Sequence, residues 1–562
     1  MKRSTTSMRS LKRLLFFTML TLILVLGACS NNDNAKNESS SKTENEAVHE
    51  NEKADNGGND AVTVEVDEQP GTVYYEIFVR SFYDSDGDGI GDLQGIIQKL
   101  DYLNDGNPDT DSDLGIGGIW LMPINPSPSY HGYDVTDYYD INPQYGTKED
   151  FKELLDEAHK RGIKIIMDLV VNHSSSEHPW FIEANQNVDS TYRDWYVWGD
   201  DSETGFSATG GPAWHRGTEG KYLGTFWSGM PDLNFDNEEV RKEMIQIGKH
   251  WLEFGVDGFR IDAAKHIYED LQSHVNDESI VEKNIAWWKE FQAGMKEAKP
   301  DVYLLGEIYD SAAVKSVPYA AAFDSTFHFG LAEKMLTMAE KESAQSLTTM
   351  LEKIYKLFND TSNGQFIDAP FLTNHDQNRT MSVLRNDVNH AKTAASLLLT
   401  MPGNPFIYYG EEIGMLGMKP DEQIREPMIW YTDGAIETGQ TTWERWISNR
   451  DDLPSVEEQS ADPASLLSHY RNLIHVRNAS AALSDGMIGS LGVETESDAI
   501  VSYARLTNEE QAGVLINLGP EPVQVTLDAD ESYEEVLYAS DEAASIDEGS
   551  ITVPAYGIVI LK

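Results

Sequence analysis

From about residue 72 onward, short runs of β-branched and aromatic residues alternate with stretches of helical spacing. Such alternation predicts an α/β fold in which crossover helices connect the strands of a parallel sheet. Eight units within about 400 residues match a (β/α)8 TIM barrel with its excess length in loops. The predicted strands cover residues 73–79, 118–123, 164–170, 258–262, 302–307, a weak run near Phe323, 371–374 and 406–410.

Two parts of the chain depart from this alternation. The stretch between His173 and about Asp232 is rich in Trp, Gly and Asp and lacks long helical periodicity, which predicts an inserted subdomain, residues 174–232, after the third strand. Residues 481–562 contain short strands broken by Asn, Gly, Pro and Asp, which predicts an antiparallel β-sandwich after a barrel domain of residues 71–480. The strands expected in the sandwich cover 499–506, 511–518, 523–527, 534–538 and 551–561.

The N-terminus has the pattern of an export signal. Basic residues between positions 2 and 13 precede an apolar run over 14–26, which is too short to span a membrane comfortably. The run ends in Leu-Gly-Ala-Cys29, which resembles a bacterial lipobox and predicts a lipoprotein signal peptide over residues 1–28 with a lipid anchor on Cys29. A simple cleaved signal peptide is the alternative. Residues 29–70 are too polar to form a core and are expected to be a flexible tether at the outer face of a bacterial membrane.

The charge of the chain limits its partners. With 94 acidic and 43 basic residues, the formal net charge is −51, so nucleic acid and anionic membrane surfaces are repelled. This acidity is compatible with work in salty or alkaline surroundings or with lineage drift, and both interpretations stay open. Cys29 is the only cysteine, which excludes an intrachain disulfide. We expect a monomer, although the sequence leaves the oligomeric state open.

Three acidic residues end strand-like runs: Asp262 ends the fourth, Glu307 the fifth and Asp376 the seventh. The active site of a TIM barrel forms at the carboxyl ends of its strands, so these side chains should converge. Glycoside hydrolysis needs two carboxyl groups around the scissile bond, and a separation of about 5 to 5.5 Å implies a retaining double displacement. For any one of these acids alone, a helix cap or a loop hydrogen bond is the alternative.

Neighbouring residues predict the role of each acid. Side chains alternate along a strand, so Arg260 and Asp262 point to the same side, where the guanidinium favours an ionised, nucleophilic carboxylate. Glu307 must hold a proton at the working pH, and two neighbouring anions raise its pKa in that direction. Asp262 is therefore the predicted nucleophile and Glu307 the predicted acid/base, within a coupled set.

Four sequence motifs identify the chain as similar to glycoside hydrolase family 13, the α-amylase family. They are DLVVNH at 168–173, GFRIDAAKH at 258–266, GE at 306–307 and NHD at 374–376. The resemblance implies that Asp262 is the nucleophile, Glu307 the acid/base and Asp376 the residue that holds the distorted sugar at the transition state. It also implies a substrate-binding set, which comprises His131, Tyr133, His173, Arg260, Lys265, His266 and His375. Tyr133 is expected to stack on the sugar ring; a core position for Tyr133 and a satisfied buried His173 are the alternatives.

Two further motifs refine this resemblance. MPDLN at 230–234 resembles a motif of members intermediate between oligo-1,6-glucosidases and neopullulanases, and Lys265-His266 after the nucleophile is similar to α-amylases. The resemblance implies endo-cleavage of α-1,4 bonds in starch and maltooligosaccharides. An oligo-1,6-glucosidase, a neopullulanase or cyclomaltodextrinase, or a transglycosylase on the same fold is the nearest alternative. A non-catalytic glucan-binding surface protein is the remote one, because fold alone does not imply function.

The loop after the first strand predicts a Ca²⁺ site. Its sequence, DSDGDGIGD over 84–92, places carboxylates at alternate positions with glycines between them, as a hard cation requires. It is not an EF-hand, because Gly95 stands where the bidentate glutamate belongs. A solvated acidic turn is the alternative, but the loop resembles the calcium loop of many family members. The predicted ligands are Asp84, Asp86, Asp88, Ile90 and Asp92.

A second Ca²⁺ site is implied by the family alone. In many α-amylases, an ion joins the barrel to the insertion through residues that correspond here to Asn172, Asp232 and the backbone carbonyl of His266. Oligo-glucosidase relatives often lack that ion, so its presence stays open.

Overall fold

The computed structural model describes residues 71–562, except 209, 269–276, 433–438, 450–454, 530 and 542–543. The predicted signal segment, Cys29 and the tether lie outside the described residues. Among the helices of the described part, none is both long enough and apolar enough to cross a bilayer.

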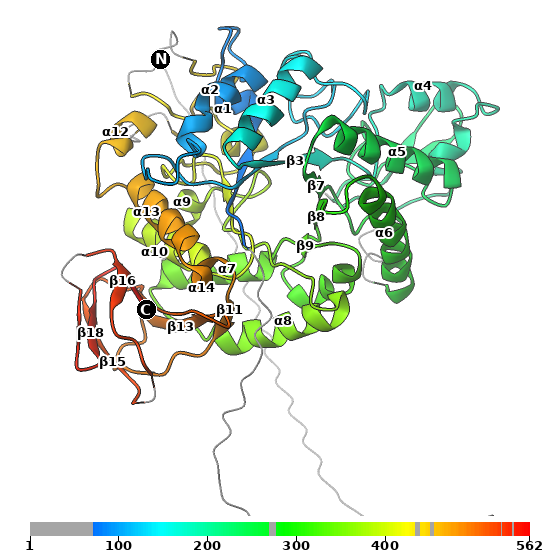
Figure 1. Cartoon of the computed structure of the whole chain (residues 1–562). Coiled ribbons are helices and arrows are strands. Elements are labelled where there is room, and N and C mark those ends of the chain that lie inside the picture. Colours follow the sequence, from blue (N-terminus) through cyan, green and yellow to red (C-terminus); the bar gives the residue numbers. More distant parts are fainter. Residues whose placement is uncertain are drawn as a thin grey trace, which may run out of the picture. The chain divides into compact units, whose positions relative to one another are not determined.

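A parallel sheet of seven strands in the order β10-β1-β2-β3-β7-β8-β9 forms the core of the barrel (Figure 1). Isolated parallel bridges join Phe327 to Ala369 and Phe371 to Phe406, so the segment around Pro370 connects β9 to β10 and closes the ring. The strands are β1 (Tyr74–Ile77), β2 (Gly118–Leu121), β3 (Lys164–Leu169), β7 (Gly258–Ile261), β8 (Tyr303–Gly306), β9 (Ser325–Thr326) and β10 (Phe406–Tyr408).

The expected TIM barrel is confirmed, with differences in its sixth and seventh strands. The weak sixth strand is the two-residue β9, slightly later than Phe323. The seventh, expected over 371–374, is present only as the two bridges at Ala369 and Phe371. Pro370 lies between them and has no N–H to give to a regular ladder, which accounts for the interruption.

Helices follow the strands and are capped by local sequence signals. Thr147 and Asp150 form a capping box at the start of α3, and Asn237 caps α5, which ends at Gly255 with φ 129°. The α-helices are α1 (Val79–Phe82), α2 (Leu93–Leu103), α3 (Lys148–Lys160), α4 (Pro179–Gln186), α5 (Glu238–Phe254), α6 (Glu278–Ala298), α7 (Phe329–Lys341), α8 (Thr348–Ser362), α9 (Thr380–Val383), α10 (Val388–Leu399), α11 (Asp421–Ile424), α12 (Val456–Ser460), α13 (Leu466–Ala479) and α14 (Ala481–Ser484). The 3₁₀ turns are η1 (Arg193–Trp195), η2 (Ala313–Lys315) and η3 (Val317–Ala321).

The interior of the barrel has an aromatic layer. Tyr74 stacks on Phe406 with 4.8 Å between ring centroids, and Trp120 contacts Phe327 at 5.4 Å. These rings form a buried cluster separate from the core between sheet and helices. Side chains two positions further along the same strands face the same interior, so Glu76 follows Tyr74 toward the carboxyl end. The aromatic layer thus lies directly below the charged groups at the carboxyl ends of the strands.

The insertion after β3 contains α4, η1 and a small antiparallel sheet in the order β4-β6-β5. Its strands are β4 (Trp198–Gly199), β5 (Trp214–Arg216) and β6 (Lys221–Leu223). Aromatic packing holds it together: Phe181 of α4 stacks on Trp198 at 5.8 Å and meets Tyr222 of β6 at 4.8 Å. The short elements agree with the lack of long helical periodicity in this stretch.

Two antiparallel sheets form the C-terminal domain, in the orders β11-β13-β14-β19-β16 and β12-β15-β18-β17 (Figure 1). A separate apolar cluster, with Leu515, Val525 and Ile551 among its members, packs within this domain, as expected for a sandwich. The run expected as one strand over 551–561 is two, since residues 554–557 turn between β18 and β19. The strands are β11 (Met487–Gly489), β12 (Val493–Glu494), β13 (Ile500–Leu506), β14 (Gln511–Asn517), β15 (Val523–Leu527), β16 (Val536–Ala539), β17 (Ile546–Asp547), β18 (Ser550–Val553) and β19 (Ile558–Leu561).

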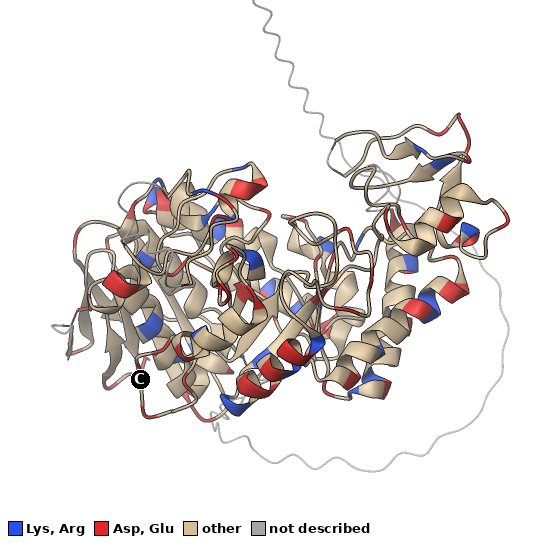
Figure 2. Ribbon diagram, turned by 90° about the horizontal axis from the view of Figure 1, so that it is seen from above, with Lys and Arg blue, Asp and Glu red and all other residues tan. Residues whose placement is uncertain are grey.

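The acidic residues are spread over many helices and loops (Figure 2). Basic residues occur beside them on outer helices, as in the contacts of Lys242 with Glu238 at 2.7 Å and with Glu239 at 3.1 Å on α5. Exposed pairs of this kind contribute little to stability. The acidity is therefore a property of the surface in general.

Candidate active site

The three predicted acids converge at the carboxyl ends of the barrel strands. Asp262 directly follows β7, Glu307 directly follows β8, and Asp376 lies on the loop after the bridge at Phe371. All three line one cavity of about 390 Å³. The lining residues are His131, Tyr133, His173, Phe226, Trp227, Met230, Asp262, Ala263, Glu307, Asp376, Asp421 and Arg425.

One guanidinium joins the two acids on neighbouring strands. Arg260 is fully buried, and its Nη1 donates to Asp262 Oδ1 at 2.6 Å. Its Nη2 lies 3.0 Å from Glu307 Oε2. Nη1 also donates to both oxygens of Asp168, at 3.0 and 3.1 Å. The two terminal nitrogens of one planar guanidinium therefore contact both Asp262 and Glu307.

A turn after β7 adds a second link between these acids. Ala263 has φ 48°, in the left-handed region that side chains with a Cβ rarely adopt, and its N–H donates to Glu307 Oε2 at 2.9 Å. Such strain clusters at functional sites, where the surroundings hold it in place. The chain therefore reverses direction beside Asp262 and orients the Glu307 carboxyl group.

Asp376 is held by two cations. Its Oδ2 lies 3.2 Å from His375 Nε2, and its Oδ1 accepts from Arg425 Nη2 at 3.1 Å. Burial favours a raised pKa for Asp376, but the charges of His375 and Arg425 outweigh it and lower the pKa well below its ordinary value. Asp376 is therefore ionised at neutral pH, and its side chain is 39% exposed.

The other two acids have raised pKa values. For Glu307, burial raises the pKa most, the carboxylates of Asp262 and Asp376 raise it further, and Arg260 opposes the rise. Burial also raises the pKa of Asp262 in spite of its hydrogen bond from Arg260. The guanidinium was expected to dominate at Asp262, but its charge is shared among three carboxylates in a desolvated site. Asp376 nevertheless has a lower pKa than Asp262 and Glu307.

The predicted substrate-binding residues around Asp376 lie together. The Tyr133 hydroxyl donates to Asp168 Oδ2 at 3.0 Å and lies 2.7 Å from His375 Nε2, while its ring stacks on that of His375 at 5.6 Å. His173 Nε2 lies 3.2 Å from the Tyr133 carbonyl oxygen, and burial lowers the pKa of His173 to about 4. His173 is therefore neutral at ordinary pH, a hydrogen-bonding group and not a cation.

Lys265 and His266 are not among the residues that line this cavity. Lys265 Nζ donates to the backbone carbonyl of Tyr309 on the loop after β8. The His266 carbonyl accepts directly from Asn172 Nδ2 at 2.7 Å, and the carboxylate of Asp232 accepts from the N–H and hydroxyl of Thr225. Asn172 and His266 are thus in direct contact, and the second Ca²⁺ site stays a prediction.

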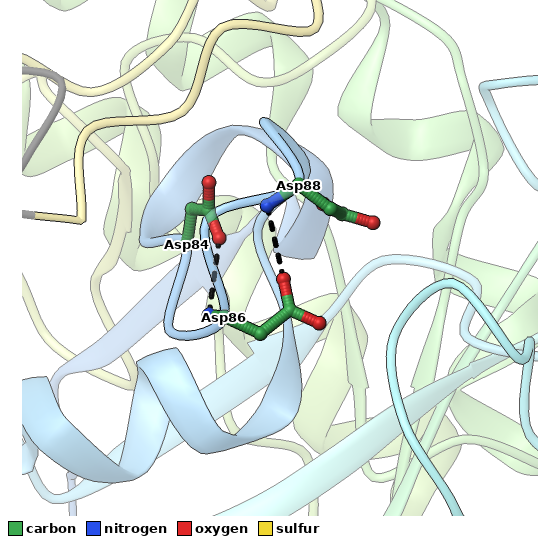
Figure 3. Close-up of side chains that lie close together, drawn as sticks. All are labelled: Asp84, Asp86 and Asp88. Carbon is green, nitrogen blue, oxygen red and sulfur yellow. Dashed lines mark hydrogen bonds between the residues drawn. The ribbon is translucent and has the colours of Figure 1, made fainter.

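Figure 3 shows the acidic loop after β1, where Asp84, Asp86 and Asp88 each offer an oxygen within 4.8 Å of the others. Asp84 Oδ2 accepts from Gly89 N at 2.8 Å, and Asp88 Oδ1 accepts from the N–H of Ile90 at 2.8 Å. Hard oxygen donors at this spacing fit Ca²⁺. Asp92 is directed elsewhere: it caps α2 by accepting from Gly95 N and also binds Ser85. The structure therefore gathers three of the five predicted ligands through their side chains.

Several residues of the site had not been singled out from the sequence. Glu76 binds His375, Asp168 binds Arg260, and Arg425 binds Asp376. A charged residue in an otherwise apolar strand, such as Glu76 in YYEI or Asp168 in KIIMDL, is a signal that could have marked the first two. Arg425 follows the short helix α11 and has no such signal. The apolar wall of the cavity comes from the insertion: Phe226, Trp227 and Met230.

Comparison with known proteins agrees with this geometry. Residues 76–486 match the family model described as alpha amylase, catalytic domain, and residues 500–560 match that of the alpha-amylase SusG C-terminal domain. Alpha-amylase 3 of Dictyoglomus thermophilum is 43% identical over 494 residues, which are 87% of this chain and 93% of that protein. An oligo-1,6-glucosidase of Bacillus cereus is 33% identical over 87% of this chain and 98% of that protein.

Among solved structures, an alpha-amylase from H. orenii superposes with a TM-score of 0.80 at 47% identity, over 88% of this chain and 99% of that one. A family model that spans most of the chain, together with relatives of this identity over nearly their whole length, establishes the family. The chain belongs to the α-amylase family, glycoside hydrolase family 13, with a catalytic TIM barrel followed by an α-amylase C-terminal domain.

Proposed function

We propose that the chain is a retaining glycoside hydrolase that cleaves internal α-1,4-glucosidic bonds of starch and maltooligosaccharides. This proposal rests on Arg260, whose two terminal nitrogens contact Asp262 and Glu307. Asp376 lines the same cavity as these two acids. Two carboxyl groups on one guanidinium supply the nucleophile and the acid/base that double displacement requires. The α-amylase relatives at 43% and 47% identity support the choice of bond.

In the first half of the reaction, Asp262 forms a bond to the anomeric carbon while the glycosidic bond breaks. Glu307 gives its proton to the departing oxygen, which is why its raised pKa suits the task. In the second half, the Glu307 carboxylate takes a proton from water, whose oxygen displaces Asp262 from the anomeric carbon. Each half of the reaction inverts the configuration at the anomeric carbon, so the product keeps the α-configuration of the substrate.

The remaining cavity residues position the sugar. Asp376, ionised and held by His375 and Arg425, can accept hydrogen bonds from hydroxyl groups that strengthen as the ring distorts. The Tyr133 ring offers an aromatic face for the CH surface of a pyranose. Phe226 and Trp227 extend the apolar wall from the insertion, and Trp227 is half exposed.

Product analysis tests the bond preference. Maltoheptaose, amylose, isomaltose and a cyclodextrin are each incubated with the full chain and with Glu307→Gln, and the products are resolved by length and anomeric form. The proposal expects short α-anomeric maltooligosaccharides from maltoheptaose and amylose, and none with the variant. Faster cleavage of isomaltose than of maltoheptaose would identify an oligo-1,6-glucosidase, in line with the Bacillus cereus relative. First-formed β-anomers would contradict the retaining mechanism.

We also propose that the acidic loop binds Ca²⁺ through Asp84, Asp86 and Asp88. The ion would tie the loop after β1 to the start of α2 and so stabilise this side of the barrel. Titration with Ca²⁺ after chelation should raise the melting temperature of the intact chain, and Asp86→Asn together with Asp88→Asn should abolish that rise. An unchanged Ca²⁺ response in the double variant would assign the effect to another site.

The location of the enzyme is a further part of the proposal. Cys29 in its lipobox-like context supports lipid attachment, and the polar residues that follow support a tether at the outer face of a bacterial membrane. Cys29→Ser should release the protein from the membrane fraction without lowering its specific activity. Retention of this variant on the membrane would contradict a lipid anchor at Cys29.

A further inference from the structure

Glu76 is a buried acid inside the barrel, outside the residues that line the catalytic cavity. It is the third residue of β1, with 2% exposure, and its Oε1 lies 2.5 Å from His375 Nδ1. Burial raises the pKa of Glu76 and the contact with His375 opposes that rise, so the carboxylate form of Glu76 depends on this partner. The pair spans the barrel interior from β1 to the loop that bears Asp376.

His375 has an acceptor at each ring nitrogen. It is fully buried; Nδ1 faces Glu76, and Nε2 faces Asp376 Oδ2 at 3.2 Å and the Tyr133 hydroxyl at 2.7 Å. A neutral imidazole donates from only one nitrogen, whereas the imidazolium donates from both. Two carboxylates on opposite sides of one buried ring therefore select the protonated form.

The charges around His375 also favour its protonated form. Burial alone lowers the pKa of His375, but Asp376 and Glu76 outweigh burial and raise it to about 9. Asp168 on β3 interacts with His375 through its charge and accepts a hydrogen bond from the Tyr133 hydroxyl. The nearby cations are Arg260 on β7, which is engaged by Asp168, Asp262 and Glu307, and Arg425, which binds Asp376. Trp120 of β2 contributes an uncharged ring edge at 5.5 Å.

We propose that Glu76 is a positioning residue of the reaction, which keeps His375 as an imidazolium so that His375 holds Asp376 ionised and correctly oriented in the cavity. The inference rests on the proposed role of Asp376 in binding the distorted sugar. Glu76 acts through His375 and does not touch the substrate. It links the first strand of the barrel to a catalytic group that lies almost 300 residues later in the chain.

Glu76→Gln tests this, because the amide keeps the shape of the side chain and removes its charge. The nitrogen resonances of His375 are followed by NMR from pH 5 to 10 without substrate, and kcat and KM on maltoheptaose are measured over the same range. We expect the His375 titration and the alkaline limb of kcat to move to lower pH by about one unit or more, which is roughly a twofold loss of kcat at pH 8 and a tenfold loss at pH 10, with KM nearly unchanged.

Glu412→Gln is the matched control. Glu412 is also fully buried and accepts from Tyr75 of the same strand β1 at 2.6 Å, but it does not contact His375. This control should leave both the His375 titration and the pH dependence of kcat at their wild-type positions. A shift of equal size in the control would assign the effect to general destabilisation and overturn the proposal.

Two other outcomes also overturn it. One is a His375 titration that is the same in Glu76→Gln as in the wild type; the other is a shifted titration with an unchanged profile of kcat. If Glu76→Gln does not fold, the wild-type NMR titration decides, since loss of the His375 proton below about pH 7 excludes the imidazolium. Failure to cleave any α-glucan would instead end the proposed function, while the substrate-free titration still decides whether Glu76 controls His375.

Discussion

The barrel contains two groups of buried acids with opposite surroundings. In the catalytic centre, Asp262, Glu307 and Asp376 lie against Arg260, His375 and Arg425. After β10, Glu411 and Glu412 are more fully buried, with 5% and 0% exposure, and their side-chain hydrogen bonds come from hydroxyl groups.

Hydroxyl groups surround this second pair. Thr380 and Tyr470 donate to Glu411 at 2.8 and 3.0 Å, and Tyr75 and Tyr102 both donate to Glu412 at 2.6 Å. These bonds do not compensate burial, which raises the pKa of Glu411 to about 8 and raises that of Glu412 as well. Glu411 is therefore protonated at neutral pH.

The difference between these two groups shows what keeps a buried acid ionised. Burial raises the pKa in both groups, but the adjacent His375 and Arg425 keep the partly exposed Asp376 ionised, whereas the hydroxyl donors around Glu411 leave it neutral. The first group is suited to chemistry and the second to structure. Each of the following changes alters one side of this contrast.

The largest effect is expected from the catalytic acids. Asp262→Asn removes the nucleophile and Glu307→Gln the proton donor, so kcat should fall by about 10²- to 10⁴-fold or more. Initial rates on maltoheptaose and circular dichroism check activity and fold together. Asp360→Asn on the exposed face of α8 is the control and should keep wild-type rates. Near-normal turnover of either catalytic variant with an intact fold would show that the roles are misassigned.

A loss of folding stability, and not only of activity, is expected from Arg260→Met. Removing the guanidinium leaves Asp168 and two catalytic acids without their shared partner, and breaking a buried pair costs about 3 to 5 kcal/mol. The loss should shrink at low pH, because the orphaned carboxyl groups can take up protons. Urea unfolding at pH 5 and pH 8 measures this. An equal loss at both values would mean that Arg260 acts through packing rather than charge.

The smallest effect concerns Glu411→Gln. The folded-state pKa of about 8 lies above the ordinary 4.5, so the folded chain keeps a proton that the unfolded chain releases. The free energy of unfolding must therefore fall as pH rises from 4.5 to 8, and a neutral amide removes this dependence. Relative to the wild type, the variant should gain about 3 kcal/mol between pH 5 and pH 8, because each pH unit between the two pKa values changes the free energy of unfolding by roughly 1.4 kcal/mol.

Thermal unfolding at the two pH values detects this gain. Glu457→Gln, an exposed acid on α12, is the control and should show no difference in pH dependence. A variant that loses stability equally at both pH values would show that Glu411 is ionised in the folded state. In that case the contrast between the two acid groups would not hold.

Local sequence was sufficient for the strand order and for the acids at the strand ends. Apolar runs mark β1, β2, β3, β7, β8 and β10, and Asp262 and Glu307 follow directly from the ends of two of them. Strand alternation alone places Arg260 on the same side as Asp262, and the contact at 2.6 Å agrees. Such features depend on neighbours in the chain, so a single sequence contains them.

The partners of those acids depend on residues far apart in the chain. Glu76 meets His375, Arg425 meets Asp376, and a single guanidinium reaches three carboxylates on three strands. Only closure of the barrel brings these groups together in a desolvated interior, where burial rather than the nearest charge sets the pKa of Asp262 and Glu307. The sequence thus determined which residues can do the chemistry, and the tertiary structure decided which of them are ionised, because proton affinity depends on everything packed around a group and not on its neighbours in the chain.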